Sequence, residues 1–394
     1  MKFTAFLRLI LWSAVTIVLI MLTIGVASGT MAVKWIDFSK LNEDWSFGMS
    51  GLIYKDAHLY TEGNAEIDDT VRNIDVRWTV GTVSVSPYEG DTLRVYEKTP
   101  NENANLRLHW YYENETLHIQ PCASKRMLGF VSWGEKDLVI EIPYSMLSDL
   151  YHLTLKSTSA TVSLSHLTLQ EVFLSSTSGA VTLSDVTVNE LELDCTSGDV
   201  LLSAVTAKEV ELDSPSGDIK VMQVAANEMD VCSTSGVVSV LEVTADALDI
   251  DTTSGDVSLR DTVVKELSID TASGDVNGEG LNARTIALDA TSGNSSVAGV
   301  FENVTAESTS GDLFISSSIT PSRLKAFTTS GNVDVRCPEG NGFTLQLDTS
   351  SGDLQSEHAL TQQGKKRICG NGEGQFDIQT TSGDVNLLKP HYKG

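Results

Sequence analysis

The chain is poor in basic residues and in cysteine. Its 394 residues include 27 Lys and Arg against 53 Asp and Glu, which gives a formal net charge of −26. This balance excludes nucleic acid as a partner, because phosphate binding requires clustered positive charge. The five cysteines are too scattered for a disulfide scaffold or a CxxC metal motif. With eight prolines and 30 glycines the chain is neither collagen-like nor proline-rich, so we expect most of it to fold.

Motifs for catalysis and cofactor binding are also missing. The seven histidines show no HExxH or similar ligand spacing. The sequence contains neither a GxxxxGK(S/T) phosphate loop nor a GxSxG nucleophile elbow. We therefore predict no catalytic residue, no cofactor and no enzymatic activity.

One long apolar run stands at the N-terminus. Leu9 to Val26 are almost all apolar and make 18 residues, a length typical of a membrane-spanning helix. We predict a transmembrane anchor at residues 9–27 that contacts the lipid bilayer, after a short flank at residues 1–8. A cleaved signal peptide is the alternative, because Ala27-Ser28-Gly29 offers small residues at a cleavage position.

The charges around this run decide its orientation only narrowly. Lys2 and Arg8 precede it and Lys34 and Lys40 follow it, so the count of flanking basic residues is nearly a tie. Acidic residues hinder export little. We predict a single-pass protein of the cell membrane whose C-terminal part is extracellular.

The rest of the chain is a repeat. The pair Ser-Gly recurs, with intervals of 19 residues six times and then 18, 20, 21 and 31. A fixed period near 20 residues is typical of a solenoid. The glycines are predicted structural turns, and they are Gly179, Gly198, Gly217, Gly236, Gly255, Gly274, Gly293, Gly311, Gly331, Gly352 and Gly383.

Apolar residues alternate on both sides of each glycine. Around Gly198 they are Leu191, Leu193, Val200 and Leu202, which lie seven and five positions before it and two and four after it. Period-two patterning indicates two short, half-buried strands per unit. Glycine would supply the turn between them, which residues with a β-carbon resist. We predict an all-β fold, a single-stranded parallel β-helix or β-solenoid with coils of about 19 residues.

A further apolar residue, seven positions after the glycine, is predicted to mark a second corner; Val205 and Val300 are examples. The predicted organisation after the anchor has four parts. They are a juxtamembrane stalk at 28–69, irregular first coils or a capping sheet at 70–150, the regular solenoid at 151–389 with an inserted loop at 360–374, and a tail at 390–394.

Aspartates recur at two positions of the unit. One follows the glycine directly and the other precedes it by four residues, so stacked coils would align them as two acidic columns. Neighbouring carboxylates could supply some of the oxygen ligands that Ca²⁺ requires. The favoured alternative is that these side chains bond the turn backbone and keep the edge soluble. The calcium candidates are Asp194, Asp199, Asp213, Asp218, Asp251, Asp256, Asp270 and Asp275.

Two other repeated features receive a structural interpretation. The serine before each glycine has no histidine partner in the pattern, so we predict a packed ladder of hydroxyl groups rather than a nucleophile. Cys195 and Cys232 lie two coils apart, about 9.6 Å at the usual strand spacing. That distance exceeds the reach of a disulfide, so we predict free thiols.

The sequence resembles a known bacterial family. The segments Ile74 to Val85 and Asp137 to Pro143, with the recurring Thr-Ser-Gly-Asp-Val, are similar to the bacterial "putative adhesin" family, a β-solenoid domain of unknown function. The resemblance covers roughly residues 70–389. It implies a surface location and a single membrane segment before the solenoid, but no motif for a ligand.

Three functional hypotheses follow. The first is a non-enzymatic surface module that binds or presents, with a surface glycan or a protein as ligand. The second is an envelope sensor or regulatory protein that meets a partner through the stalk and the first coils. The third, an enzyme acting on polysaccharides, is disfavoured because the arginines of the repeat region occupy no repeated position near the aspartates.

Overall fold

The structure is a computed structural model that describes residues 45–48, 51–126 and 136–390. The predicted anchor at residues 9–27 lies outside the described residues. Within the described part of the chain, no helix is long and apolar enough to cross a membrane.

The chain divides into two compact units, which are described separately. The first comprises Met1–Ala57 and Ser124–Val131. Its described part is a small antiparallel sheet in the order β1 (Trp45–Gly48), β2 (Gly51–Tyr54) and β10 (Lys125–Arg126). The side chains of Leu52 and Tyr54 are buried.

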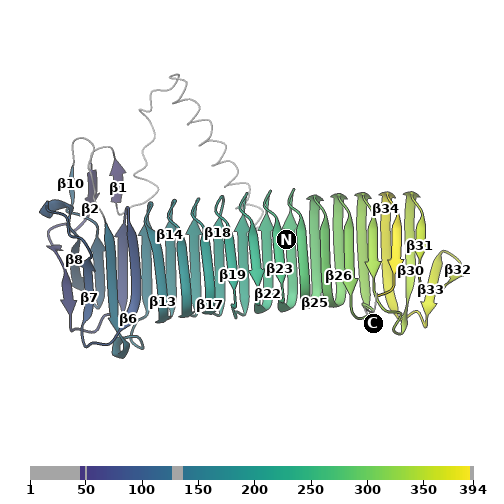
Figure 1. Ribbon diagram of the computed structural model, residues 1–394, viewed down its shortest axis with the longest axis horizontal. Coiled ribbons are helices and arrows are strands. Elements are labelled where there is room, and N and C mark those ends of the chain that lie inside the picture. The colour runs from purple at the N-terminus through teal and green to yellow at the C-terminus, as the bar shows by residue number, and fades with distance from the viewer. Residues whose placement is uncertain (1–44, 49–50, 127–135, 391–394) are drawn as a thin grey trace, which may run out of the picture. The chain divides into compact units, whose positions relative to one another are not determined.

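The second unit, His58–Ala123 with Ser132–Gly394, is a parallel β-solenoid. Each coil gives one strand to each of two parallel ladders, which we call ladder A and ladder B, and Figure 1 shows these strands standing side by side. Partners in adjacent regular coils are 19 residues apart, as in Leu191 with Val210. The predicted fold class is confirmed for this unit.

Ladder A contains the strand before each corner glycine. In spatial order its strands are β9 (Thr116–Gln120), β5 (Asn73–Trp78), β12 (His152–Ser157), β14 (Glu171–Ser176), β16 (Glu190–Cys195), β18 (Glu209–Ser214), β20 (Glu228–Ser233), β22 (Thr244–Thr252), β24 (Val263–Thr271), the second halves of β25 (Val276–Ser292) and β26 (Ser295–Ser310), β28 (Arg323–Ser330), β34 (Gly374–Ser382) and β30 (Gly342–Ser351).

Ladder B contains the strand after each corner glycine. In the same order its strands are β11 (Asp137–Pro143), β6 (Thr82–Tyr88), β13 (Thr161–Thr168), β15 (Val181–Thr187), β17 (Val200–Thr206), β19 (Ile219–Met222), β21 (Val238–Leu241), β23 (Val257–Arg260), the first halves of β25 and β26, β27 (Leu313–Ser317), β29 (Val333–Arg336), β35 (Val385–Leu388) and β31 (Leu354–Ser356).

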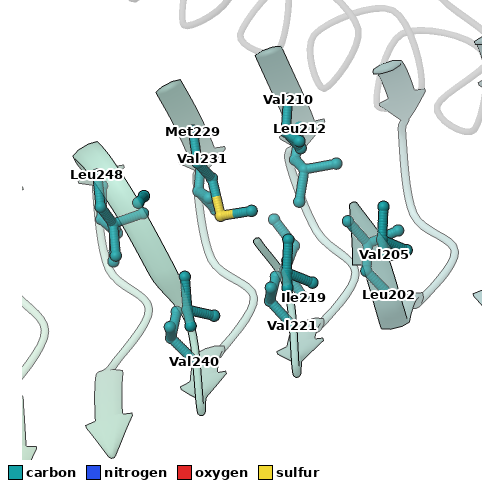
Figure 2. Packing of buried hydrophobic residues seen from close by; sticks show 14 of the residues in the cluster. Leu202, Val205, Val210, Leu212, Ile219, Val221, Met229, Val231, Val240 and Leu248 are labelled. Carbon is teal, nitrogen blue, oxygen red and sulfur yellow. The ribbon is translucent and has the colours of Figure 1, made fainter. Parts of the chain in front are cut away.

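The core is a narrow column of aliphatic side chains between the two ladders. Leu191, Leu193, Val200 and Leu202, the predicted inward set, are each at most 1% exposed. Figure 2 shows the same arrangement in the next coils, where side chains from both strands of a coil point toward one another. Successive strand residues face opposite sides, so the period-two pattern of the sequence sets this burial directly.

In the coils from Gly179 onward, a glycine closes the first corner between ladders A and B, and successive glycines approach each other closely. A β-carbon built on Gly198 would lie 2.1 Å from the carbonyl oxygen of Gly179, and one on Gly217 would lie 2.0 Å from that of Gly198. Neither glycine has a positive φ. At these two positions glycine is required by the close approach of successive coils, whereas Gly293, Gly352 and Gly383 combine the same close approach with a positive φ.

The left-handed residues instead form the second corner, six positions after the glycine. Ala204 has φ of 53° and Glu242 has φ of 53°. This bend turns the chain so that Val205 points into the core from a short third side. The equivalent residues with positive φ are His166, Asp185, Gln223, Asp261 and Gly280.

Most corners have a buried serine or threonine hydroxyl three residues before the glycine, whereas Cys195 takes that position before Gly198 and Ala290 before Gly293. Ser176 Oγ donates to the carbonyl of Gly179 at 2.9 Å and accepts its amide at 3.1 Å. The predicted ladder of packed serines, one residue before the glycine, is wrong in its packing: Ser178 and Ser197 are exposed. Their hydroxyls donate to backbone carbonyls of the preceding coil.

One predicted inward residue is also wrong. Val300 is 36% exposed, and Phe301, at 0%, takes the inward position. The coil that begins at Gly293 has 18 residues, against 19 in the coil before it and 20 in the coil after it, and the register shifts between Gly278 and Leu281 in the paired strand. The shortened coil moves the next residue onto the core side.

The coils at the N-terminal end are stacked out of chain order. Strands β9 and β11 form the outermost coil, whereas β5 and β6, which come first in the chain, lie between it and β12 and β13. Residues from 58 to 69, which the sequence analysis assigned to the stalk, give β3 (Thr61–Glu62) and β4 (Ala65–Ile67) to this end. The remaining elements there are β7 (Leu93–Glu97), β8 (His109–Glu113) and two short 3-10 helices, Ala104–Leu106 and Tyr144–Met146.

The C-terminal end shows the same exchange. Strands β34 and β35, the last in the chain, pair with β28 and β29, so that β30 and β31 form the outermost coil (Figure 1). Consecutive corner glycines are thus Gly331, Gly383 and Gly352. The predicted inserted loop is a hairpin, β32 (Leu360–Gln363) and β33 (Lys366–Gly370), which pairs antiparallel with β30.

Candidate binding surface

The outer face of ladder A carries the densest charge among the described residues. Each of its strands exposes three positions, which lie eight, six and four residues before the corner glycine. On β16 these are Glu190, Glu192 and Asp194, and the register aligns them with Glu209, Glu211 and Asp213 on β18. We call the following set the acidic face: Glu190, Glu192, Asp194, Glu209, Glu211, Asp213, Glu228, Asp230, Asp249, Asp251, Glu266 and Asp270.

No lysine or arginine occupies these three positions on the five strands β16, β18, β20, β22 and β24. The strands are spaced by about 4.8 Å, so the carboxylates repel one another along each column. Burial and the neighbouring Asp270 carboxylate raise the pKa of Asp251 to about 6. Burial, and then the charge of Asp289, likewise raises the pKa of Asp270. The acidic face therefore favours the binding of protons or other cations.

The outer face of ladder B has a different character. Its outward positions on β15 and β17 are Thr182, Ser184, Leu201 and Ser203. On β19 and β21 they are Lys220, Met222, Ser239 and Leu241. Negative charge is thus concentrated on one of the two faces, although both are formed by the same coils.

Toward the N-terminal coils, basic side chains and histidines enter the outward columns of ladder A. There the same outward columns contain Arg77, Lys156, His152 and His118. Arg77, His152 and Lys156 line a shallow depression of about 350 Å³, whose lining also includes Asn73, Asp75 and Thr116.

Residues beside this depression contact its charged side chains. Asp75 accepts from His118 Nδ1 at 3.2 Å and lies 3.8 Å from Arg77 Nη2. The ring of Tyr111 stacks on His118 with 4.4 Å between the centroids. Lys156 Nζ stands 5.6 Å from the centre of the Phe173 ring. This end offers both charge signs and aromatic rings to a ligand.

The predicted aspartates occupy two different parts of the coil. Asp194, Asp213, Asp251 and Asp270 lie on the acidic face. Asp199, Asp218, Asp256 and Asp275 lie at the first corner, directly after the glycines that the sequence analysis identified.

Each corner carboxylate bonds the backbone of the next coil. Asp199 accepts from the amide of Asp218 at 3.1 Å, and Asp275 accepts from the amide of Asn294 at 2.8 Å. Asparagine makes the same hydrogen bond, since Asn332 accepts from the amide of Asp384 at 2.9 Å. This row of hydrogen bonds gives the corner aspartates a structural role that requires no metal.

The two cysteines singled out by spacing do not face each other. Cys195 is buried beside its corner glycine, and Cys232 lies on the acidic side of β20; both are free thiols. Burial, reinforced by the surrounding carboxylates, raises the pKa of Cys232 to about 12.

Of the acidic face, only the column of aspartates four residues before the glycine was predicted from the sequence. The glutamates eight residues before the glycine were not predicted, although Glu171, Glu190, Glu209 and Glu228 recur in four consecutive units. Their regular spacing was the available signal. Only the register shows that they share one face with the aspartates.

Comparisons with known proteins place these features in a family. A family model described as Toastrack DUF4097 matches residues 71–260 and 228–388. No curated protein matches the chain.

Three solved structures are similar to the chain at low identity. A putative cell adhesion protein from Clostridium sporogenes has 10% identity and a TM-score of 0.19, over 84% of this chain and 100% of that one. A putative lipid binding protein from Parabacteroides distasonis has 11% identity and a TM-score of 0.28, over 84% and 96%. A putative adhesin from Bacteroides fragilis has 10% identity and a TM-score of 0.23, over 83% and 98%.

Proposed function

The chain belongs to the Toastrack DUF4097 family, and we propose that it is a membrane-anchored, non-enzymatic binding module of the cell surface. In this proposal residues 9–27 anchor it in the bilayer and the solenoid stands outside the cell. The apolar run from Leu9 to Val26 supports the anchor.

The observation that carries the binding role is the acidic face. Twelve carboxylates stand in register on five neighbouring strands, with no basic side chain at the three outward positions. A flat sheet with a regular charge repeat suits an extended ligand better than a small molecule. Such a field also attracts a cationic partner from a distance.

The partner that fits this surface is a basic segment of another surface protein. Lysine and arginine side chains would meet carboxylates repeated at about 4.8 Å along the stack. Binding would relieve the repulsion within each column. It would weaken as salt rises, because exposed charges are screened within about 8 Å at physiological ionic strength.

The location is tested by protease treatment of intact cells. We expect added protease to remove the solenoid from cells that remain sealed, while a cytoplasmic marker survives. A solenoid that is cleaved only after lysis would place it in the cytoplasm and overturn the surface proposal.

The binding role is tested with a defined cationic probe, a ten-residue oligolysine, titrated by calorimetry at low and at 150 mM salt. The test variant is Glu192→Gln with Glu211→Gln and Asp230→Asn, three changes in the central column of the acidic face. We expect it to weaken binding at least tenfold.

The matched control is Asp185→Asn with Glu242→Gln and Asp261→Asn. It removes the same number of charges from the second corner of the same solenoid. Equal weakening in both variants would show that net charge alone governs binding and would contradict a role for the face.

A second candidate function is an envelope sensor that contacts a membrane partner through its first coils. The depression around Arg77, His152 and Lys156 favours it, because that end offers mixed charge and aromatic rings. Cross-linking in intact cells tests it. Capture of a specific membrane protein that is lost in Arg77→Ala with Lys156→Ala, and kept in the acidic-face variant, would support the sensor.

A further inference from the structure

Three potential metal ligands converge at the C-terminal end of the solenoid. Glu339 follows β29, His358 lies between β31 and β32, and Cys369 lies on the hairpin strand β33. One donor atom from each residue lies within 4.8 Å of the other two. These positions are 19 and 11 residues apart in the chain, and the antiparallel pairing of β33 with β30 and with β32 brings them together.

One ring nitrogen of His358 makes a hydrogen bond, and the other has no hydrogen-bond partner. Nε2 lies 3.2 Å from the carbonyl oxygen of Leu388, which can only accept, so this nitrogen carries the proton. Nδ1 is then the nitrogen with a lone pair. It is buried and has no hydrogen-bond partner, and the residue as a whole is 4% exposed.

A buried acceptor nitrogen without a partner destabilises the fold unless a hydrogen-bond donor or a metal ion binds it. A carbonyl that accepts the other ring N–H is the usual outer partner of a metal-bound histidine, because it fixes the tautomer and the ring orientation. The ring is also held from the side by Phe343, whose centroid lies 5.3 Å away. The tautomer thus leaves the lone pair of Nδ1 available to a metal ion.

The other two ligands complete a mixed set. Cys369 is 0% exposed, and its thiol is free. The Glu339 carboxylate lies at the surface, 3.7 Å from Lys389 Nζ. The site therefore has a buried nitrogen and sulfur with an oxygen ligand on its open side.

We propose that Glu339, His358 and Cys369 bind a Zn²⁺ ion that fastens the hairpin to the end of the solenoid. Sulfur, nitrogen and oxygen ligands suit zinc, whereas Ca²⁺ and Mg²⁺ require oxygen. Ligand atoms around a tetrahedral zinc lie roughly 3.5 Å apart, given bonds of about 2.0–2.3 Å. In the proposed site the three ligand atoms, now within 4.8 Å of one another, move to this spacing when the ion binds, and water takes the fourth position.

A second cysteine stands close to this site. Cys337 is 1% exposed, and its amide donates at 3.2 Å to the same Leu388 carbonyl that His358 contacts. A disulfide between Cys337 and Cys369 would prevent Cys369 from binding the metal, so the experiment must separate that state from the reduced one.

The test uses the full chain in mild detergent, reduced and stripped of metal, and titrated with Co²⁺. We expect a near-ultraviolet charge-transfer band from a thiolate bound to Co²⁺, which saturates at one equivalent and disappears when Zn²⁺ is added. The band reports a cysteine ligand, so cations bound to surface carboxylates do not produce it.

Two variants locate the site. Cys369→Ser should lose the band, and His358→Asn should weaken Co²⁺ binding at least tenfold. Cys232→Ser, which removes the cysteine on the acidic side of β20, should keep both the band and the affinity. Far-ultraviolet circular dichroism confirms that each variant is folded.

Two results would overturn the proposal. One is the absence of the band in the reduced wild-type chain. A chain that is isolated with a Cys337–Cys369 disulfide and gives no band after reduction counts as the same result. The other is a band of unchanged strength in folded Cys369→Ser.

Discussion

The backbones of Gly198 and Gly179 approach so closely that a β-carbon on Gly198 would lie 2.1 Å from the carbonyl oxygen of Gly179. The same contact repeats along the first corner of the regular coils, with 2.0 Å between a β-carbon on Gly217 and the oxygen of Gly198. From Gly179 onward, the strand spacing of the stack therefore leaves no room for a side chain at this corner.

Replacement of a corner glycine should therefore loosen the stack. We expect Gly198→Ala to lower the stability by about 1–3 kcal/mol or more, because the atom in its way is backbone and cannot rotate aside. The measurement is urea unfolding followed by circular dichroism. The control is Ala204→Gly at the second corner, where φ is 53°. At this position the relief of left-handed backbone strain offsets the entropy cost of glycine. We therefore expect the free energy of unfolding to change by no more than about 1 kcal/mol. Equal losses in the two variants would contradict the close-contact account.

A charge placed in the core should abolish the cooperative transition. Leu193 is 1% exposed, and Leu193→Asp would bury a carboxylate with no partner. Thr206 is exposed, so Thr206→Asp should leave the melting temperature nearly unchanged. The thermal melts of the two variants are the measurement, and a wild-type melt for Leu193→Asp would mean that this side chain does not face the core.

The N-terminal coils contain a buried ion pair whose loss should be costly. The side chains of Lys136 and Glu97 are 0% and 1% exposed and are bonded to each other. Glu97 also accepts the amide of Leu108 at 3.0 Å, and Lys136 donates to the carbonyl of Leu106 at 2.8 Å. Lys136→Met leaves the Glu97 charge unpaired, and we expect a loss of about 3–5 kcal/mol in chemical denaturation.

The double variant Lys136→Met with Glu97→Gln is the control for this pair. It removes both charges while the amide keeps an oxygen for Leu108, so it should recover part of the loss. A double variant no more stable than Lys136→Met would show that the cost comes from packing and not from the unpaired charge.

The acidic face should make the protein more stable in mild acid. The pKa of Asp251 is raised from 3.8 to about 6, mainly by burial. The folded state therefore holds the proton more tightly than the unfolded state, and stability falls as pH rises from about 4 to about 6. We expect a higher melting temperature at pH 5 than at pH 7.5.

Asp251→Asn should reduce this difference, whereas Asp185→Asn at the second corner should not. A melting temperature that rises steadily from pH 5 to pH 7.5 in the wild type would contradict the raised pKa, since it would mean that the folded carboxylates are stabilised in their charged form.

The regular part of the fold could be predicted because one physical rule sets it. Leu191, Leu193, Val200 and Leu202 alternate with polar residues, and side chains of a strand point alternately to opposite faces. The role of the glycines could not be obtained in the same way. A recurring glycine is compatible with a left-handed turn or with a close contact, and only the position of Gly179 beside Gly198 distinguishes them.

The repeat pattern of the sequence could not predict the order of the coils at the two ends of the solenoid or the candidate metal ligands. The interval of 31 residues before Gly383 indicates an insertion, but not that the hairpin returns the chain to a slot between Gly331 and Gly352. Glu339, His358 and Cys369 have no motif spacing, because the pairing of β33 with β30 and β32 brings them together. The acidic face was found only in part, since the glutamate columns required the strand register.

The order of the stack can be measured by pulsed electron spin resonance between labels on cysteines introduced at exposed corner positions. Burial raises the pKa of the native Cys122 to about 11 and of Cys337 to about 12, so these thiols should label slowly. Labels on Asp199→Cys with Asp384→Cys should lie about 38 Å apart, eight strand spacings along the stack. Labels on Asp199→Cys with Asp353→Cys should lie about 43 Å apart, at nine spacings. A shorter distance to position 353 than to position 384, or distances far above these values, would contradict the stacked and exchanged coils on which the account depends.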